Sequence, residues 1–408
     1  MNQVATLSPI IRARDEFPGL LTAAGKPWHY LDTAATAQKP QAVIDAMARA
    51  LGKDYATVHR GVYARSAEMT LAYEAARCRV AQFLGGREDE VVFTRGATEA
   101  INLVAATWGA ANIGPGDRIL LSTIEHHSNI VPWQLLAERV GAQIDVCPLT
   151  DDGRIDLDAA QAMLDERPKL VAFAHVSNVL GSLLDAKRAA ELAHAVGARL
   201  LLDGCQAAPR LKVDVAELGC DFYVFSAHKL YGPTGIGVLW GRQALLESMP
   251  PWQGGGAMID RVTFERTTFA PPPQRFEAGT PAITEAVAMH AAIDFVEAIG
   301  LARIHAHEAA LVSQLRGELR AMNDITLFGP DDSAGIVSFM LDGVHPHDLG
   351  TILDEADVAI RAGHHCAQPL MDHLGVPATA RASFGLYSDE GDVAALLEGI
   401  ARTRRIFG

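Results

Sequence analysis

The sequence predicts an α/β protein with a large domain built on a mostly parallel seven-stranded sheet, followed by a small α+β domain. Seven short runs that are apolar throughout recur between residues 91 and 240. Segments with helical spacing separate these runs, which is typical of parallel strands covered by helices on both faces. After about residue 300 the chain alternates long helical segments with a few short strands, which favours a second, smaller unit.

The seven predicted strands have the length expected of buried strands. They are VVFT (91–94), RILLST (118–123), QIDVCPL (143–149), KLVAFAHV (169–176), ARLLLD (198–203), DFYVFS (221–226) and GIGVLW (235–240). Helices are predicted between them over 97–108, 130–140, 158–165 and 186–196. The prolines at 271–273 and Gly279 interrupt this pattern, so we expect a long functional loop over 264–281.

Apolar residues at helical spacing predict a long core-facing helix after residue 300. They are Leu301, Ile304, Leu311, Leu315, Leu319 and Met322. Further elements are expected over 336–341 (strand), 347–356 (helix), 358–363 and 381–387 (strands) and 389–404 (helix). We therefore expect a large domain over 25–297 and a small domain formed by 1–24 and 298–408.

Composition narrows the function classes. The 408 residues include 35 Lys and Arg against 49 Asp and Glu, a net charge of −14, which argues against a nucleic-acid or anionic-membrane binder. The start of the chain has no apolar run of signal-peptide length, and no apolar run is long enough to span a membrane. The five cysteines are scattered and form no C-x-x-C pair. We expect a cytoplasmic protein without a disulfide framework.

A candidate anion site follows the first predicted strand. There Gly96, Ala97, Thr98 and Glu99 open a helix, and free N–H groups at a helix start bind phosphate. The same residues serve equally well as a plain helix cap. The chain has neither a P-loop motif nor a G-x-G-x-x-G motif after a strand, so neither a nucleoside triphosphate nor a dinucleotide is implied.

Two further residues stand at strand ends, where sheets of this kind bind their ligands. Asp203 ends the run LLLD, although in isolation it reads better as a helix cap. Lys229 follows the strand DFYVFS and is flanked by His228, Leu230 and Tyr231. A lysine held against apolar walls can lose proton affinity and form an imine with a carbonyl. Lysine is also rare in this chain, with seven lysines against 28 arginines.

Together these residues predict a site for pyridoxal 5'-phosphate. The lysine would hold the aldehyde, the carboxylate the ring nitrogen, and the helix start the phosphate. His126, at another strand end, is a candidate to stack on the ring. His126 and His127 could instead bind a metal, but adjacent side chains diverge and no third ligand has suitable spacing, so no metal is expected.

Long motifs extend this prediction to a family. RAGHHCAQPLM (361–371), SAHKLYGPTGIG (226–237) and EHHSNIVPW (125–133) resemble segments of the SUF-type cysteine desulfurases. These are class V aminotransferase-like, fold-type I pyridoxal-phosphate transferases, a group that includes selenocysteine lyase-like enzymes. The resemblance runs from YLDTAA (30–35) to RASFGLY (381–387). The sequence departs from the family at three positions. The family often has Thr at the position of Ala97, Ala or Ser at that of Cys205, and His at that of Arg210.

The resemblance implies a role for each matching residue. Lys229 is the Schiff-base lysine, Asp203 the partner of the ring nitrogen, and Cys366 the cysteine that accepts sulfur. Gln206 contacts the ring hydroxyl and His126 stacks on the ring. The phosphate is held by Ala97, Thr98, Ser226 and His228, with Thr280 reaching in from the second subunit of a homodimer. The substrate is bound by Asn178, Arg361, His364 and Arg381.

The implied reaction converts L-cysteine to L-alanine and a Cys366 persulfide, which a small acceptor protein takes up for iron–sulfur cluster assembly. We expect Arg361, His364 and His365 to favour the reactive thiolate of Cys366. A compact turn around Cys366 predicts a recessed persulfide that depends on a dedicated acceptor. Selenocysteine lyase or cysteine sulfinate desulfinase, an aminotransferase, and a non-catalytic scaffold of a sulfur-transfer complex are the alternatives.

Overall fold

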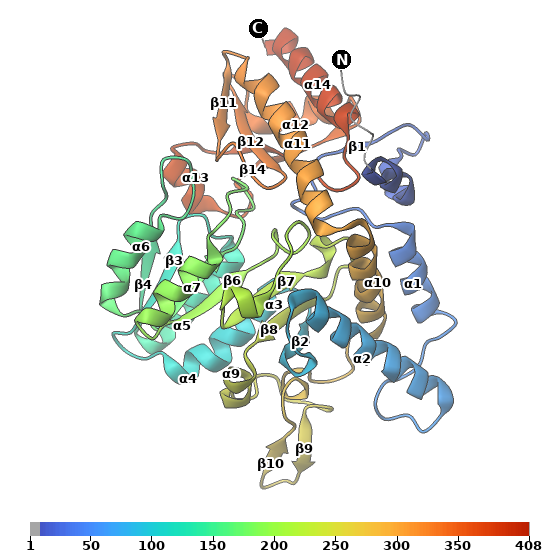
Figure 1. Cartoon of the computed structure of the whole chain (residues 1–408), viewed down its shortest axis with the longest axis vertical. Helices are drawn as coiled ribbons and strands as arrows, with labels where there is room; N and C mark the ends of the chain where they lie inside the picture. The colour runs from blue at the N-terminus through green and yellow to red at the C-terminus, as the bar shows by residue number, and fades with distance from the viewer. Residues whose placement is uncertain (1–8, 408) are drawn as a thin grey trace.

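A computed structural model describes residues 9–407 and contains two main sheets (Figure 1). Within these residues the large sheet has seven strands in the order β2-β8-β7-β6-β5-β3-β4. The strands are β2 (Val91–Thr94), β3 (Arg118–Ser122), β4 (Gln143–Cys147), β5 (Leu170–Ala174), β6 (Arg199–Asp203), β7 (Phe222–Ser226) and β8 (Gly237–Gly241). Strands β7, β6, β5, β3 and β4 run parallel to one another, and β8 runs antiparallel to both of its neighbours, β7 and the edge strand β2. The predicted fold class is confirmed.

Helices cover both faces of the large sheet (Figure 1), and all its strands except the edge strand β4 are therefore almost entirely buried. The predicted helices are α3 (Ala97–Val104), which continues through a π-helical segment (Ala105–Gly109) into α4 (Ala110–Asn112), and α5 (Val131–Val140), α6 (Leu157–Met163) and α7 (Ala186–Ala195). Helices α1 (Gln41–Leu51), α2 (Ala64–Leu84), α8 (Val215–Leu218), α9 (Gln243–Ser248) and α10 (Ile283–Ile299) complete this part.

The stretch predicted as a long loop starts inside a hairpin. Strands β9 (Ile259–Val262) and β10 (Thr267–Phe269) pair antiparallel and project from the body of the molecule (Figure 1). Residues 264–266 lie in the hairpin loop, and the prediction was wrong for 267–269, because the β-branched and aromatic residues Thr267, Thr268 and Phe269 favour a strand. From residue 270 to 282 the chain does run as a loop, with one short 3-10 turn at Gln274–Phe276.

The small sheet is antiparallel, with the order β11-β12-β15-β14 among the described residues. Its strands are β11 (Ile325–Phe328), β12 (Ile336–Leu341), β14 (Arg361–Gly363) and β15 (Thr379–Ser383). Helices α11 (Leu301–Arg320), α12 (Pro346–Asp354) and α14 (Glu390–Phe407) belong to this part, and α13 (Gln368–Leu374) lies between β14 and β15. The predicted stripe is buried as far as Leu319, and Leu311, Leu315 and Leu319 pack with Val337 and Phe339 of β12. Met322, its last predicted member, lies beyond the end of α11 and is half-buried.

Two predicted strands of this part differ in detail. The run 358–363 divides into β13 (Val358–Ala359), which pairs parallel with β1 (His29–Tyr30), and β14 of the small sheet. The run 381–387 is a strand only as far as Ser383. The first eight residues of the predicted small domain lie outside the described residues. Between residues 9 and 407, no helix combines the length and the apolar character needed to cross a bilayer.

Candidate active site

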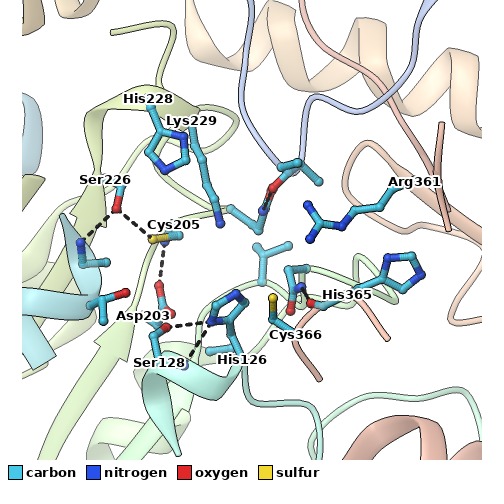
Figure 2. Close-up of a pocket in the computed structure, with 18 of the residues that line it drawn as sticks. His126, Ser128, Asp203, Cys205, Ser226, His228, Lys229, Arg361, His365 and Cys366 are labelled. Carbon is cyan, nitrogen blue, oxygen red and sulfur yellow. Dashed lines mark hydrogen bonds between the residues drawn. The ribbon is translucent and has the colours of Figure 1, made fainter. Parts of the chain in front are cut away.

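The carboxyl ends of the parallel strands open into one cavity between the two sheets (Figure 2). Parallel strands end at the same edge of a sheet, so residues far apart in the sequence meet there. The predicted residues that line the cavity are Ala97, Thr98, His126, Asn178, Asp203, Gln206, Ser226, His228, Lys229, Arg361, Cys366 and Arg381. Figure 2 shows the Lys229 amine and the Cys366 thiol directed into this same cavity.

Asp203 is buried at the end of β6, and one of its two carboxylate oxygens already has a hydrogen-bond partner. One oxygen accepts a hydrogen bond from the backbone N–H of Cys205 at 3.0 Å. The buried Cys205 also lines the cavity, with its thiol 3.9 Å from the Ser226 hydroxyl. Burial, together with the nearby Asp203 charge, raises the pKa of Cys205 to about 12, so this thiol stays protonated at neutral pH.

The predicted phosphate residues meet at one corner of the cavity. The N–H of Ala97, at the start of α3, donates to the Ser226 hydroxyl at the end of β7, at 2.8 Å. The backbone of β8 approaches the start of α3 closely here. A Cβ on Gly237 would lie only 2.4 Å from the Cα of Gly96, so this position requires glycine. Burial and the neighbouring Lys229 lower the pKa of His228 to about 4, so its ring is neutral at neutral pH.

His126 follows β3 and presents a neutral ring to the cavity. Burial, then the charge of Lys229, lowers its pKa to about 4. Its Nδ1 accepts a hydrogen bond from the backbone N–H of Ser128 at 3.1 Å. Because Nδ1 is the acceptor, the proton of the neutral ring is on Nε2.

A carboxyl that the sequence analysis did not single out supports this segment. Glu125 is fully buried and accepts hydrogen bonds from the Ser122 hydroxyl (2.5 Å), the Ala174 N–H (2.9 Å) and the Asn129 amide (2.7 Å). The three hydrogen bonds lower the pKa of Glu125, but burial has the larger effect and raises it to about 8. The signal available in the sequence was an acidic residue directly after a buried strand, in STIEHHSN.

Arg381, on β15 of the small sheet, completes the wall opposite Asp203. Its guanidinium donates to the Asn178 carbonyl at 2.7 Å and to the Asp32 carboxylate at 3.0 Å. Its Nε is buried and has no hydrogen-bond partner in the described part of the chain. Burial lowers its pKa to about 10, which leaves the group cationic at neutral pH. Asp32 was missed as a contact, although it lies in the quoted YLDTAA motif.

Cys366 sits in a tight turn before α13. His365 and Cys366 both adopt left-handed backbone conformations, with φ of 53° and 58°. The Asn178 amide donates to the His365 carbonyl at 2.8 Å, and the His127 N–H donates to the Cys366 carbonyl at 2.7 Å. The Cys366 residue is half-buried. The compact turn expected from the sequence is therefore present.

The neighbouring histidines differ from expectation. His365, not His364, lines the cavity, and its Nε2 contacts Thr379 of β15. Burial and the charges of Arg381 and Arg361 lower the pKa of His365 to about 3. Its ring is therefore neutral at neutral pH and brings no positive charge to the Cys366 thiol. The expectation that Arg361, His364 and His365 favour the thiolate stays a prediction. His364 is exposed and lies outside the cavity lining.

Thr280 lies away from the cavity of its own chain. It is exposed and lines two neighbouring hollows, one beside Arg95 and Trp252 and one beside His59 and Arg60. Its predicted contact with the site of a second subunit stays a prediction.

This fold and site define a class of protein. The model of the aminotransferase class-V family matches residues 29–396, so the chain belongs to that family. Particular relatives narrow the comparison. The cysteine desulfurase of Cronobacter sakazakii is 48% identical over 398 residues, 97% of this chain and 98% of that protein. The probable cysteine desulfurase of Halalkalibacterium halodurans is 49% identical over 385 residues, 94% of this chain and 95% of that protein.

Solved structures agree. The cysteine desulfurase CsdA of Escherichia coli superposes with a TM-score of 0.92 at 38% identity, covering 99% of this chain and 100% of that chain. The apo cysteine desulfurase of Thermococcus onnurineus has a TM-score of 0.91 at 36% identity, covering 98% of this chain and 99% of that chain.

Proposed function

We propose that this protein is a pyridoxal-phosphate-dependent cysteine desulfurase of the SUF type. It converts L-cysteine to L-alanine and passes the sulfur through Cys366 to a small acceptor protein for iron–sulfur cluster assembly. One observation carries the proposal: Lys229, Asp203 and Cys366 line a single cavity in a chain that closely resembles named cysteine desulfurases.

The residues present fit pyridoxal phosphate. A buried carboxylate (Asp203) lies at one side of the cavity, a backbone N–H beside a hydroxyl (Ala97 and Ser226) at one corner, and a lysine amine points inside. The buried Nε of Arg381 and Nδ1 of His365, both on residues that line the cavity, have no partner among the described residues, as expected of a site that receives a polar ligand.

The cofactor would be held by Lys229 at its aldehyde, Asp203 at its ring nitrogen and Gln206 at its ring hydroxyl. Ala97, Thr98, Ser226 and His228 would hold its phosphate. When bound, pyridoxal phosphate supplies the electron sink that allows bonds at the substrate Cα and Cβ to break.

The chain's own residues then perform the reaction. The Arg381 guanidinium, with Arg361 and Asn178, binds the substrate carboxylate, and the Lys229 amine takes the Cα proton. His126 keeps its proton on Nε2, from which it can donate. The Cys366 thiolate attacks the substrate sulfur. A sulfur–sulfur bond forms, the carbon–sulfur bond breaks with its electron pair left on Cβ, and Cβ takes up a proton. Protonated Lys229 returns a proton to Cα, which gives alanine.

Cys366 is the residue that tests this function. Incubation of the holoenzyme with L-cysteine should yield alanine and a mass increase of one sulfur on Cys366. We expect Cys366→Ala to lower cysteine turnover by about 10²-fold or more, since no thiolate remains to accept sulfur. Unchanged alanine formation by this variant would overturn the proposal.

The same variant separates the desulfurase from the selenocysteine lyase alternative. Selenium leaves carbon more easily than sulfur, so selenocysteine turnover should largely survive in Cys366→Ala. A keto acid formed from alanine or glutamate would favour the aminotransferase, and a colourless purified protein would favour the scaffold.

The recessed position of Cys366 supports dependence on an acceptor protein. The turn is held by the His127 backbone N–H and the Asn178 amide, so the persulfide has little reach. Alanine production should therefore rise when a small thiol-bearing acceptor protein is added. Equal rates with and without the acceptor would count against this part of the proposal.

The assembly and setting complete the proposal. The exposed position of Thr280 supports a homodimer in which this residue reaches the partner's site. The free thiols of all five cysteines support a reducing compartment, the cytoplasm. We keep the division into a large domain over 25–297 and a small domain over 1–24 and 298–408, which the separate large and small sheets support.

A further inference from the structure

His127 makes two contacts with the Cys366 turn that the proposed chemistry does not use. Its backbone N–H donates to the Cys366 carbonyl at 2.7 Å. Its ring Nε2 accepts a hydrogen bond from the backbone N–H of Gln368 at 3.1 Å. One residue at the end of β3 therefore holds the chain on both sides of Ala367.

The helix that follows Cys366 needs such a contact. Gln368 is the first residue of α13. The N-cap residue, Ala367, has no polar side chain that could accept a hydrogen bond from the backbone N–H groups of the first turn. Pro369 has no N–H, and the N–H groups of Leu370 and Met371 already donate to the Ala367 carbonyl. The Gln368 N–H is thus the donor that a cap must satisfy, and the His127 ring does so from another element.

The turn itself has a reason to relax without this cap. Two consecutive non-glycine residues, His365 and Cys366, adopt left-handed conformations that cost energy and persist only when their surroundings hold them. The His127 ring accepts because it is neutral, and burial together with the charge of His364 lowers its pKa. A neutral ring with its acceptor at Nε2 carries its proton on Nδ1.

We infer that His127 is a positioning residue that caps α13 from outside the helix and fixes the Cys366 turn, so that the thiol faces the cavity. The contacts stand on their own, and their consequence for sulfur transfer rests on the proposed function. His127 neither lines the cavity nor contacts the reacting atoms, which separates it from His126.

The test measures the turn directly, without cysteine. In the holoenzyme, His127→Leu should raise backbone amide exchange over residues 367–371 about five- to tenfold, which corresponds to the loss of one helix cap. The alkylation rate of Cys366 by iodoacetamide should rise severalfold as the turn opens. His127→Gln keeps an acceptor at similar reach and should return both rates to within about twofold of wild type.

A matched control comes from α12. His345 is the N-cap residue of that helix, and its ring Nδ1 accepts from the N–H of His347 at 3.2 Å. It is an exposed histidine cap that belongs to its own helix and, among the described residues, has no hydrogen bond to the Cys366 turn. His345→Leu should lower the melting temperature about as much as His127→Leu but leave Cys366 alkylation and exchange over 367–371 unchanged.

Two results would overturn the inference: unchanged exchange and alkylation in His127→Leu, or a His127→Gln variant that behaves like His127→Leu. If His127→Leu does not fold, His127→Lys, which offers only donors, replaces it in the comparison with His127→Gln. The readouts need no turnover, so a failure here is distinct from a failure of the desulfurase assay. If both hold, His127→Leu should lower kcat for alanine formation while KM for cysteine stays unchanged.

Discussion

At the scale of single residues, Asp203 carries the charge on which the proposed chemistry depends. We expect Asp203→Asn, which keeps the shape and removes the charge, to lower alanine formation by about 10²-fold or more. Steady-state kinetics with measured cofactor content would check this. Asp156→Asn is the matched control, because Asp156 caps α6 outside the cavity and asparagine caps about as well. Full activity of a cofactor-loaded Asp203→Asn protein would contradict the role of Asp203.

Glu125 predicts a pH dependence of stability. Its folded pKa, raised to about 8 by burial, lies above the value of about 4.3 expected for an unfolded glutamate. Between these values the unfolded state has released the proton and the folded state retains it, so the stability due to this group falls as pH rises. Glu125→Gln has no carboxyl group at this position, so its stability lacks this contribution to the pH dependence.

Thermal unfolding at pH 5, 6.5 and 8 would check this prediction. The difference in stability between Glu125→Gln and wild type should shift in favour of the variant as the pH rises. A difference that stays constant across this range would show that the buried carboxyl is ionised throughout.

Which site residues could be predicted depended on how they are held. Asp203 and Lys229 were predicted from the sequence pattern, because the carboxyl ends of parallel strands meet at one edge. Ser226 was predicted only from the family resemblance. Asp32 and Glu125 did not, because their roles arise from contacts with Arg381 and Ala174 that are 349 and 49 residues away in the chain. No local pattern encodes such pairs.

At the scale of elements, α2 depends on a buried ion pair. Arg77 bonds both carboxylate oxygens of Glu277, at 2.6 and 2.9 Å, and Glu277 also accepts from the N–H of Phe93 at 2.7 Å. The Arg77 side chain is 3% exposed and that of Glu277 is 9% exposed. This pair fastens the loop after the β9–β10 hairpin to α2 and β2.

Breaking one side of this pair should be costly. We expect Glu277→Gln to lower the free energy of unfolding by up to about 3–5 kcal/mol, because among the described residues the buried Arg77 then keeps only the partly exposed Glu74 carboxylate, at 2.9 Å, as an ion-pair partner. The double variant Arg77→Met with Glu277→Met should recover much of that loss. Denaturant titration measures both, and Asp89→Asn, which breaks the exposed Arg87–Asp89 pair, should change little. An equal loss in the single and double variants would contradict the coupling.

The buried polar residues of α2, Arg77 among them, explain why this helix was not predicted. Its buried face includes Ser66, Tyr73 and Arg77 beside apolar residues, so it has no clean apolar stripe. The strands of the large sheet were predictable because burial on both faces leaves uninterrupted apolar runs.

At the scale of the whole molecule, a buried ion pair joins the parts around the two sheets. Arg210, close to Gln206 in the cavity, bonds Glu308 of α11 at 2.7 Å and donates to the carbonyls of Gln206 (3.1 Å) and Phe384 (3.2 Å). Gly335 leaves room for the pair, since a Cβ there would lie 2.3 Å from Glu308 and 2.6 Å from Arg210.

Gly335→Ala should therefore lower the melting temperature more than Gly343→Ala does. Both glycines have positive φ, 66° and 74°, so both variants incur backbone strain. Only at Gly335 does the added methyl group overlap the ion pair, because nothing lies within 4 Å of a Cβ at Gly343. Equal shifts of the two melting temperatures would show that the pair adapts. This junction could not be predicted from sequence, which identifies each sheet but not how one packs against the other.

The raised pKa of the buried Cys205 thiol has a practical consequence. Burial gives Cys147 and Cys220 the same raised pKa of about 12, so three of the five sulfurs are poor nucleophiles. A reagent bearing a carboxylate would be drawn toward Arg381 and delivered to Cys366. The two remaining thiols are Cys78 on α2 and Cys366, and of these only Cys366 lines the cavity with Arg381. A Cys78→Ser variant would therefore offer a single attachment point, through which a fluorophore or a capture tag could report on the docking of a sulfur-carrying partner without any added cysteine.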